Sequence, residues 1–456
     1  MKKLAKRTVA SMVVLALFWA GFGVYLVKLL IGGNKWAAFP VNSHVYADGV
    51  LVAGTIVDAD GVTLASEQDG KRIYSPDYMT RVSTLHVVGD VMGNIGTGLL
   101  STYKTQLMGY SILDGVYSPD GRGNTVYTTI DSRLCNTALR ALGSRSGAVT
   151  VYNYKTGDIV CMVSTPGFDP ADPPDLNAAG ANARYEGAYI NRALSATYSP
   201  GSIFKTVTLM AAIEKLPDLW DMTFTCTGSV EIGGEVITCS GVHGRENIHD
   251  AYAHSCNVAF AELALRLGGE AIARAAQSAG LLDRFSTSGI PVAAGRFDAA
   301  GPGTVDLGWS GVGQYMDLVN PLAMARFMGA IANGGATVNP RLVSAVTTPL
   351  GLSLPGYGRG ASHRLISKST AETLQKMMRY NVESYYGNGR FPGLTVCGKT
   401  GTAEMGPGQA PHAWFTGFLE DDAHPYAFSV IIEHGGTGLS EATKVANAVL
   451  QQAVKI

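Results

Sequence analysis

The sequence carries little charge for its length, and neither sign is in excess. Of its 456 residues 16% are Asp, Glu, Lys or Arg, and the formal net charge is -1. Soluble proteins average about 25% charged residues. A balanced charge excludes general electrostatic attraction to nucleic acid, so we expect no nucleic-acid partner. Because 46% of the residues are hydrophobic, the chain is not disordered, and part of its apolar mass is expected to lie in a membrane.

Long uncharged apolar runs are also scarce, and a single one has the length needed to cross a bilayer. Residues 9–27 contain no charge, and a helix of that length spans roughly 28 Å. Basic residues precede it, which favours a cytoplasmic N-terminus. We therefore expect residues 1–33 to form a cytoplasmic tip and a single transmembrane helix, with the rest of the chain extracytoplasmic at the cell membrane. A cleaved signal peptide is the alternative, although its apolar region usually spans about 7 to 15 residues.

The chain after the anchor divides into a small and a large segment. Residues 34–124 are moderately polar, with strand-like runs at 50–57 and 82–88. They hold no cluster of chemically active side chains, so we expect a pedestal or dimerisation-like domain that acts as spacer or docking module. The turn-forming run 119–123 then separates this segment from residues 125–456.

The large segment contains strands near both of its ends. A first strand at 125–130 precedes a helix that Asp131 and Ser132 should cap and that runs to about 142. Five later runs are also strand-like: 148–154, 159–164, 395–402, 412–419 and 426–433. A helix follows from about residue 440, and the middle of the segment is largely helical. The pattern predicts a mixed α/β (α+β) fold, in which a five-stranded antiparallel sheet drawn from both ends is flanked by helices.

The most specific short pattern is a serine followed three residues later by a lysine, Ser202 and Lys205. Pro200 and Gly201 end the preceding segment, so Ser202 should begin a helix with Lys205 on the same face. Serine is a poor nucleophile until a base takes its proton, and a lysine with a pKa near 10.4 is charged. Burial or a second cation would lower that pKa, so the pair predicts another lysine nearby.

Ser255 and Asn257 form a second candidate pair, on a loop or helix start. The hydroxyl can pass protons and the carboxamide can bind a peptide-like substrate. Ser-x-Asn sequences also occur at the start of many helices, where they cap the helix, so this pair becomes evidence for a site only beside the other patterns.

The third pattern is Lys399-Thr400-Gly401-Thr402, at the end of an apolar strand. Lys399 supplies the second cation, and Thr400 and Thr402 share one face of the strand, where they can bind a substrate carboxylate. Gly401 should let an extended substrate lie close to the backbone. Backbone N–H groups of Ser202 and Thr402 could face a tetrahedral oxyanion.

In this order the three patterns resemble those of the penicillin-binding proteins, specifically the membrane-anchored, monofunctional class B D,D-transpeptidases. The signatures of that superfamily are Ser-x-x-Lys, Ser-x-Asn and Lys-Thr-Gly. Further blocks similar to the family lie at 147–149, 155–159, 164–170, 191–193, 313–314, 332–335 and 412–415. The pedestal is too short for a glycosyltransferase domain. Asn320-Pro321 departs from the usual Thr-Pro, and residues 57–60 lack the arginine usual in that pedestal motif.

The resemblance implies a penicillin-binding or serine β-lactamase-like transpeptidase domain over residues 125–456. It also implies a role in peptidoglycan synthesis, for cell shape or cell division. The implied ligands are stem peptides ending in D-Ala-D-Ala and β-lactam antibiotics, and a membrane-embedded glycan polymerase is a candidate partner. No cofactor and no metal are expected. The implied roles are acyl-enzyme formation by Ser202, base catalysis by Lys205, proton relay by Ser255, acyl-amide binding by Asn257, and carboxylate binding by Lys399, Thr400 and Thr402.

Other functions share these motifs. A D,D-carboxypeptidase uses water as the acceptor, and a membrane-anchored β-lactamase or β-lactam sensor would acylate the same serine. A lactamase needs a base for its deacylating water, and we assign no carboxylate to that task. A non-catalytic cell-wall scaffold is the alternative from a different class.

The six cysteines leave two possibilities open. Cys226 and Cys239 flank a Gly-rich, hairpin-like stretch on the expected oxidising side of the membrane, where a disulfide can form. With His243 and Cys256 they could instead hold zinc, although the spacing matches no strong template.

Overall fold

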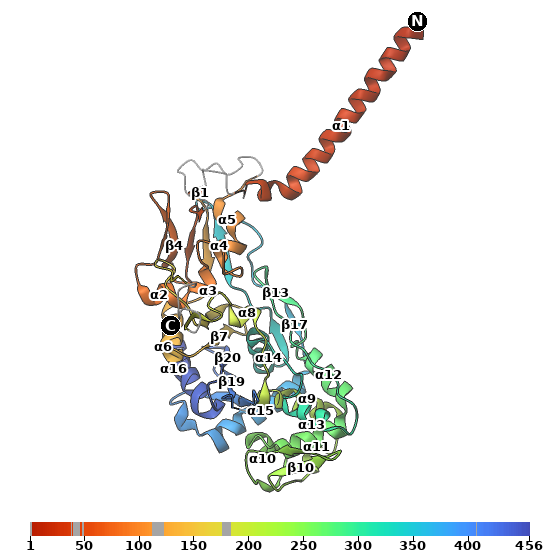
Figure 1. Cartoon of the computed structure of the whole chain (residues 1–456), viewed down its shortest axis with the longest axis vertical. Coiled ribbons are helices and arrows are strands. Elements are labelled where there is room, and N and C mark those ends of the chain that lie inside the picture. The colour runs from red at the N-terminus through yellow and green to blue at the C-terminus, as the bar shows by residue number, and fades with distance from the viewer. Residues whose placement is uncertain are drawn as a thin grey trace.

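The computed structural model describes residues 2–37, 39, 46–47, 50–111, 123–175, 184–406 and 408–456. Most of the predicted turn at 119–123 lies outside the described residues. Helix α1 (Lys2–Ala37) projects alone from one end of the molecule (Figure 1). Within the described residues, its stretch Lys2–Gly33 is the one helix long and apolar enough to cross a membrane, and none of its most apolar window is buried. This helix fits a single-pass membrane anchor.

A five-stranded pedestal sheet lies next to α1. Its strand order is β16 (Val343–Thr347), β6 (Thr125–Thr128), β3 (Thr55–Val57), β4 (Thr63–Gln68), β5 (Lys71–Tyr74). Strands β3 and β6 pair in parallel and the other neighbours are antiparallel. The pedestal also contains a short pair, β1 (Tyr46–Ala47) and β2 (Val50–Leu51), and the helices α2 (Tyr78–Ser83), α3 (Leu85–Val88), α4 (Leu99–Thr102) and α5 (Lys104–Met108).

The predicted strand at 82–88 is wrong, because these residues belong to α2 and α3. The Asp77 side chain caps α2 by accepting from the Thr80 N–H at 2.7 Å. The β-branched residues Val82, Val87 and Val88 are buried in helical conformation, so the cap and tertiary packing overcome their preference for strands. The run at 50–57 is interrupted by Gly54 at a positive φ of 85°.

Strand β6 joins the pedestal sheet, although the sequence assigned it to the large segment. Strand β16 also enters this sheet from far along the chain. The boundary predicted at residue 124 therefore falls beside a strand that both segments share, and the domain division stays a prediction.

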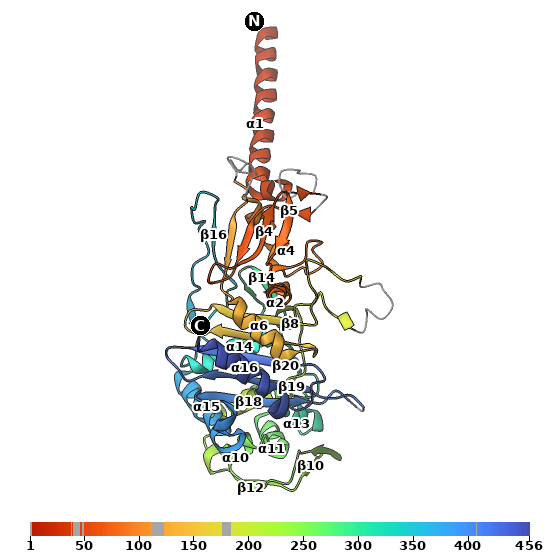
Figure 2. The ribbon, with the colours of Figure 1, turned by 90° about the vertical axis from the view of Figure 1, so that its left-hand side faces the viewer.

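The central sheet confirms the predicted fold. It is antiparallel, with the order β18 (Val396–Ala403), β19 (His412–Leu419), β20 (Tyr426–Ile432), β7 (Gly147–Asn153), β8 (Ile159–Thr165). Helices α6 (Ser132–Leu142) and α16 (Thr443–Ala453) cover one face, and α14 (Pro321–Ala332) covers the other (Figures 1 and 2). Every residue of β19 and β20 is buried, because helices cover both faces. Asp131 caps α6 as predicted.

The middle of the chain forms the expected helical insertion, at the end of the molecule far from α1 (Figure 1). Its helices are α9 (Lys205–Lys215), α10 (Ile248–Ala253), α11 (Asn257–Leu267), α12 (Gly269–Ser278) and α13 (Val305–Val312). Two small antiparallel pairs accompany them, β9 (Phe224–Cys226) with β12 (Gly244–Glu246), and β10 (Ser229–Ile232) with β11 (Glu235–Thr238). The remaining strands and α-helices are α8 (Arg192–Ser195), β13 (Phe285–Thr287), β14 (Ile290–Val292), β15 (Ala336–Val338), β17 (Ser362–Arg364) and α15 (Lys368–Tyr380). Short 3-10 or π-helical segments lie at Gly201–Ile203, Leu219–Asp221, Asn381–Tyr386, Asn388–Arg390 and Gly438–Ala442.

Candidate active site

Ser202 lies in a 3-10 turn, Gly201–Ile203, that leads directly into α9. The Gly201 N–H donates to the Gly313 carbonyl at 2.8 Å, and the Trp414 indole donates to the Ser199 carbonyl at 3.0 Å. Gly201 has φ 53°, and a Cβ there would lie 2.6 Å from the Thr402 carbonyl oxygen. Only glycine fits this approach, so the turn is fixed between β18 and the end of α13.

The Lys205 amine lies 2.7 Å from the Ser202 hydroxyl oxygen. It also donates to the Ser255 carbonyl at 2.8 Å and to Asn257 Oδ1 at 2.7 Å. Its side chain is fully buried. The structure therefore brings together the residues that the first two sequence patterns contribute.

Lys399 reaches the same place from β18. Its Nζ donates to the Ser255 hydroxyl at 3.0 Å and to the Thr400 carbonyl at 3.1 Å. Burial lowers the pKa of Lys205 to about 7. Burial, and then the charge of Lys205, lower the pKa of Lys399 well below its ordinary value. The second lysine that the Ser-Lys pair predicts thus lies beside the pair. Burial is what lowers the pKa of Lys205, whereas at Lys399 the charge of the neighbouring lysine adds to the effect of burial.

Ser255 sits between α10 and α11 with a positive φ of 61°, a conformation that costs a non-glycine residue energy and often marks a functional position. Asn257 begins α11. Its Nδ2 donates to the Thr238 carbonyl at 2.8 Å, and its backbone N–H donates to Cys239 Sγ at 3.2 Å. The last residue of β11 and the cysteine that follows it therefore help to hold Asn257 in place.

The strand β18 contributes the remaining predicted residues. The Thr400 N–H and hydroxyl each lie 3.2 Å from the Tyr386 hydroxyl, and Thr402 Oγ1 accepts from Gly438 N–H at 3.3 Å. A Cβ on Gly401 would lie 2.9 Å from the Pro200 carbonyl oxygen. The missing side chain of Gly401 therefore lets β18 pack against the Ser202 turn, and the approach of substrate to its backbone stays a prediction.

These groups surround a pocket of about 380 Å³. Helix α13, which ends at Val312, and residues beyond the three motifs also contribute to its wall. The lining residues are Ser202, Thr238, Cys239, Ser240, His254, Ser255, Asn257, Trp309, Val312, Gln314, Tyr385, Thr400, Thr402, Glu404, Thr437 and Leu439. Sequence reasoning missed Thr238, Tyr385 and the buried Tyr386, since no short pattern marks them.

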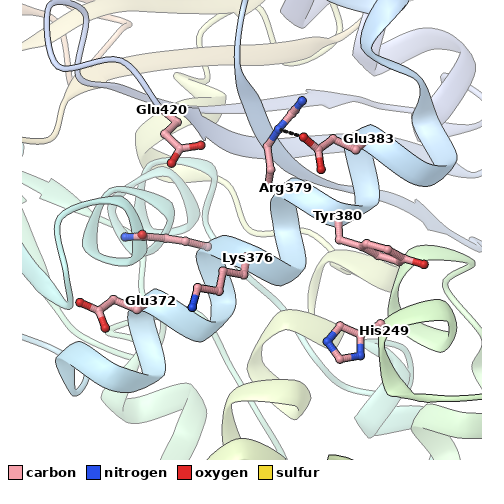
Figure 3. Close-up of a pocket in the computed structure, with 8 residues that line it drawn as sticks. His249, Glu372, Lys376, Arg379, Tyr380, Glu383 and Glu420 are labelled. Atoms are coloured by element: carbon pink, nitrogen blue, oxygen red, sulfur yellow. Dashed lines mark hydrogen bonds and ion pairs between the residues drawn. The ribbon is translucent and has the colours of Figure 1, made fainter.

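A second pocket, of about 480 Å³, opens along α15 (Figure 3). It is lined by His249, Glu372, Gln375, Lys376, Arg379, Tyr380, Glu383 and Glu420. The Tyr380 hydroxyl donates to Asp250 at 2.6 Å, and Arg379 pairs with Glu383 at 3.0 Å. Its lining contains no serine, threonine or cysteine beside a base, so the smaller pocket is the candidate active site.

Comparisons with known proteins match this chain to one family. The penicillin binding protein transpeptidase domain family matches residues 147–452. "Peptidoglycan D,D-transpeptidase PbpA" of Mycolicibacterium smegmatis is 30% identical over 481 residues, covering 96% of this chain and 94% of that protein. The protein of the same name from Mycobacterium tuberculosis is 27% identical over 441 residues, covering 91% and 89%.

Solved structures show the same fold. Penicillin-binding protein A of M. tuberculosis aligns with a TM-score of 0.76 at 28% identity, over 88% of this chain and 99% of that chain. Its ceftriaxone acyl-enzyme complex aligns with a TM-score of 0.75 at 28% identity, over 88% and 98%. From its sequence, its fold and the grouping of its three motifs in one pocket, this chain belongs to the penicillin-binding protein transpeptidase family, among the class B members.

Proposed function

We propose that this protein is a peptidoglycan D,D-transpeptidase that cross-links stem peptides through an acyl-enzyme on Ser202. One observation carries the proposal: the buried amine of Lys205 lies 2.7 Å from the Ser202 hydroxyl, in a pocket that Ser255, Asn257 and Thr400 also line. The names of the relatives and the β-lactam acyl-enzyme of a structural neighbour support the same activity.

Acylation begins with proton transfer from Ser202 to Lys205. With a pKa of about 7, a large fraction of this amine is neutral at neutral pH and can accept the proton. The Ser202 oxygen attacks the penultimate D-alanine carbonyl, and the bond to the terminal D-alanine breaks. The Ser255 hydroxyl lies 3.2 Å from Lys205 Nζ, so it can relay a proton to the leaving amine.

Binding groups for the substrate surround the attacked carbonyl. Asn257 Nδ2 uses one hydrogen for Thr238, and its second hydrogen can donate to the acyl amide. Lys399, Thr400 and Thr402 are assigned to the terminal carboxylate, because an amine and two hydroxyls can all donate hydrogen bonds to an anion. The backbone N–H groups of Ser202 and Thr402 are assigned to the oxyanion.

The second step transfers the acyl group to an amine of a neighbouring stem. That amine attacks the Ser202 ester, a peptide bond forms, and Ser202 regains its proton. A membrane-embedded glycan polymerase is the candidate partner, because cross-linking needs newly made strands. Basic residues precede the apolar part of α1, and for that reason we assign the catalytic part of the chain to the outer side of the cell membrane.

Fluorescent penicillin labelling of the full chain in membranes tests the proposal. Wild type and Ser202→Ala are compared with Ser369→Ala, which alters an exposed serine of α15. We expect stable labelling of wild type and of the Ser369 variant, and none of the Ser202 variant. Equal labelling of the Ser202 variant would refute the assignment.

Two further measurements separate the related activities. Release of the label within seconds would identify a β-lactamase. Incubation with a pentapeptide and an amine acceptor should yield the joined peptide, whereas release of D-alanine without a joined product would identify a carboxypeptidase.

A further inference from the structure

Four potential metal ligands lie together beside the active site. They are Cys226 at the end of β9, Cys239 after β11, His243 before β12, and Cys256 at the N-cap of α11. Their three sulfur atoms and one imidazole nitrogen all lie within 4.8 Å of one another. All six cysteines of the chain are free thiols.

The spacing of these atoms fits a single tetrahedral ion. Zinc binds cysteine sulfur at about 2.3 Å and imidazole nitrogen at about 2.0 Å, so sulfurs on one zinc lie about 3.8 Å apart. Cys239 Sγ and His243 Nδ1 are 3.6 Å apart. A disulfide would use two of the thiols and leave the third thiol and the imidazole without a function.

Backbone hydrogen bonds around the four side chains are suited to thiolates that hold a cation. Backbone N–H groups donate to two of the sulfurs, from Asn257 to Cys239 at 3.2 Å and from Ala259 to Cys256 at 3.5 Å. Such outer hydrogen bonds orient ligands and support thiolate charge.

A buried carboxylate lies against the same group. Glu246 is 5% exposed, and its Oε1, 3.9 Å from His243 Nδ1, has no hydrogen-bond partner in the described part of the chain. A buried carboxylate oxygen without a partner is costly. This oxygen, without a partner among the described residues, lies against the same four side chains and is a second, independent indication of a ligand there.

We propose that Cys226, Cys239, His243 and Cys256 bind one Zn²⁺ ion. With three thiolates and one imidazole the protein fills all four positions of a tetrahedron, which is typical of structural rather than catalytic zinc. This site is separate from the acylation chemistry and goes beyond the proposed function.

The zinc would act on the active site by positioning two of its residues. Cys256 lies directly between Ser255 and Asn257 in the chain. Cys239 accepts the Asn257 N–H, and the adjacent Thr238 accepts the Asn257 carboxamide. Binding of one ion by Cys239 and Cys256 therefore ties the β10–β11 hairpin to the start of α11.

Metal content of the full chain, purified in detergent under reducing conditions without chelator, tests the site. We expect about one zinc per chain in wild type and in Cys161→Ser, which removes a buried thiol of β8. Cys239→Ser and His243→Ala should lose most of it. Zinc retained in both of these variants, or absent from wild type, would overturn the proposal.

Cobalt substitution of wild type gives a test that does not depend on folding of the variants. Thiolate ligation predicts sulfur-to-cobalt charge-transfer absorption in the near ultraviolet and the visible bands of tetrahedral cobalt. Absence of both, or a Cys226–Cys239 disulfide found by mass spectrometry in protein never exposed to reductant, argues against a metal. Removal of zinc should slow penicillin acylation about 10-fold or more, and an unchanged rate would refute the positioning role.

Discussion

Lys205 and Lys399 donate to the same oxygen, the hydroxyl of Ser255, at 3.2 Å and 3.0 Å. Both amines are buried, and their hydrogen-bond partners are hydroxyl, carbonyl and carboxamide oxygens rather than carboxylates. Two buried cations without a counter-charge repel each other and lose hydration, which favours neutral amines. The Ser255 hydroxyl is thus placed to exchange protons with either lysine.

Acylation should depend on pH through Lys205. Because the pKa of this amine is lowered to about 7, it is protonated at lower pH and cannot serve as base. We expect the second-order rate of penicillin acylation to fall about 10-fold per pH unit below pH 6 and to level off above pH 8. Stopped-flow or gel measurement between pH 5 and 9 checks this.

Lys205→Arg provides the control for the pH profile. Arginine stays charged at every accessible pH, so acylation should fall by about 100-fold or more and the inflection near neutral pH should vanish. A profile for this variant that matches wild type would remove Lys205 from the role of base.

Tyr386→Phe should weaken substrate binding more than the chemical step. The Tyr386 hydroxyl lies 3.2 Å from both the N–H and the hydroxyl of Thr400, and its loss removes a partner of the half-buried Thr400, at a cost on the order of 1 kcal/mol. Because Thr400 is assigned to the substrate carboxylate, KM for a stem peptide should rise while kcat changes less. Tyr78→Phe, which alters an exposed ring of α2 outside the pocket, serves as control, and equal effects of the two variants would contradict the prediction.

Asp58 should stabilise the junction between the pedestal and α6. One of its carboxylate oxygens accepts from the Ser132 hydroxyl at 2.7 Å, and the other accepts from the Val62 N–H at 2.8 Å. Asp58 is 1% exposed, so Asp58→Ala should lower the free energy of unfolding by about 2 to 3 kcal/mol.

Asp60→Ala is the matched control for Asp58. Asp60 pairs with Arg133 on the surface, and such exposed pairs contribute about 0 to 1 kcal/mol. Denaturant unfolding of the two variants in detergent gives both values, and the prediction fails if the Asp60 variant loses as much stability.

Asp317 should make the folded protein less stable as pH rises, whereas a carboxylate in an ion pair makes it less stable as pH falls. Burial first, and then the charge of Asp298, hold the pKa of Asp317 well above 3.8. A folded pKa above the unfolded value means that stability is lost as pH rises through the folded pKa. We expect Asp317→Asn to unfold at higher temperature than wild type at pH 8 and at nearly the same temperature at pH 4. Asp422→Asn, at a side chain 98% exposed, should change little at either pH.

The sequence predicted the elements that depend on neighbouring residues alone, namely the central strands and the capped helix α6. The five strands of the central sheet are apolar runs of strand length, and Asp131 is a good N-cap; both features can be read without knowing the partners. The run at 82–88 was misassigned because its helices depend on the Asp77 cap and on burial of their valines.

Most partners far apart in the chain escaped sequence reasoning. The pairing of β16 with β6 and the contact of Tyr386 with Thr400 join separate segments that no short pattern links. The group around His243 was named from the sequence as one of two possibilities, and the structure brings its four side chains together. The catalytic motifs are an exception, because each motif's chemistry depends on the others. A serine with a lysine base predicts a second lysine nearby, and Lys399 lies beside them.

The shared pedestal sheet limits how this protein can be rebuilt. Strands β3, β4 and β5 come from residues 34–124, whereas β6 and β16 come from residues 125–456, and all five form one hydrogen-bonded sheet. A chimera that exchanged only residues 34–124 with those of a relative would replace three strands of this sheet and keep two. The relative's counterpart of β3 would then have to pair with β6 in the same register. Evolution is therefore expected to exchange the pedestal and the catalytic part together, as a single unit of inheritance.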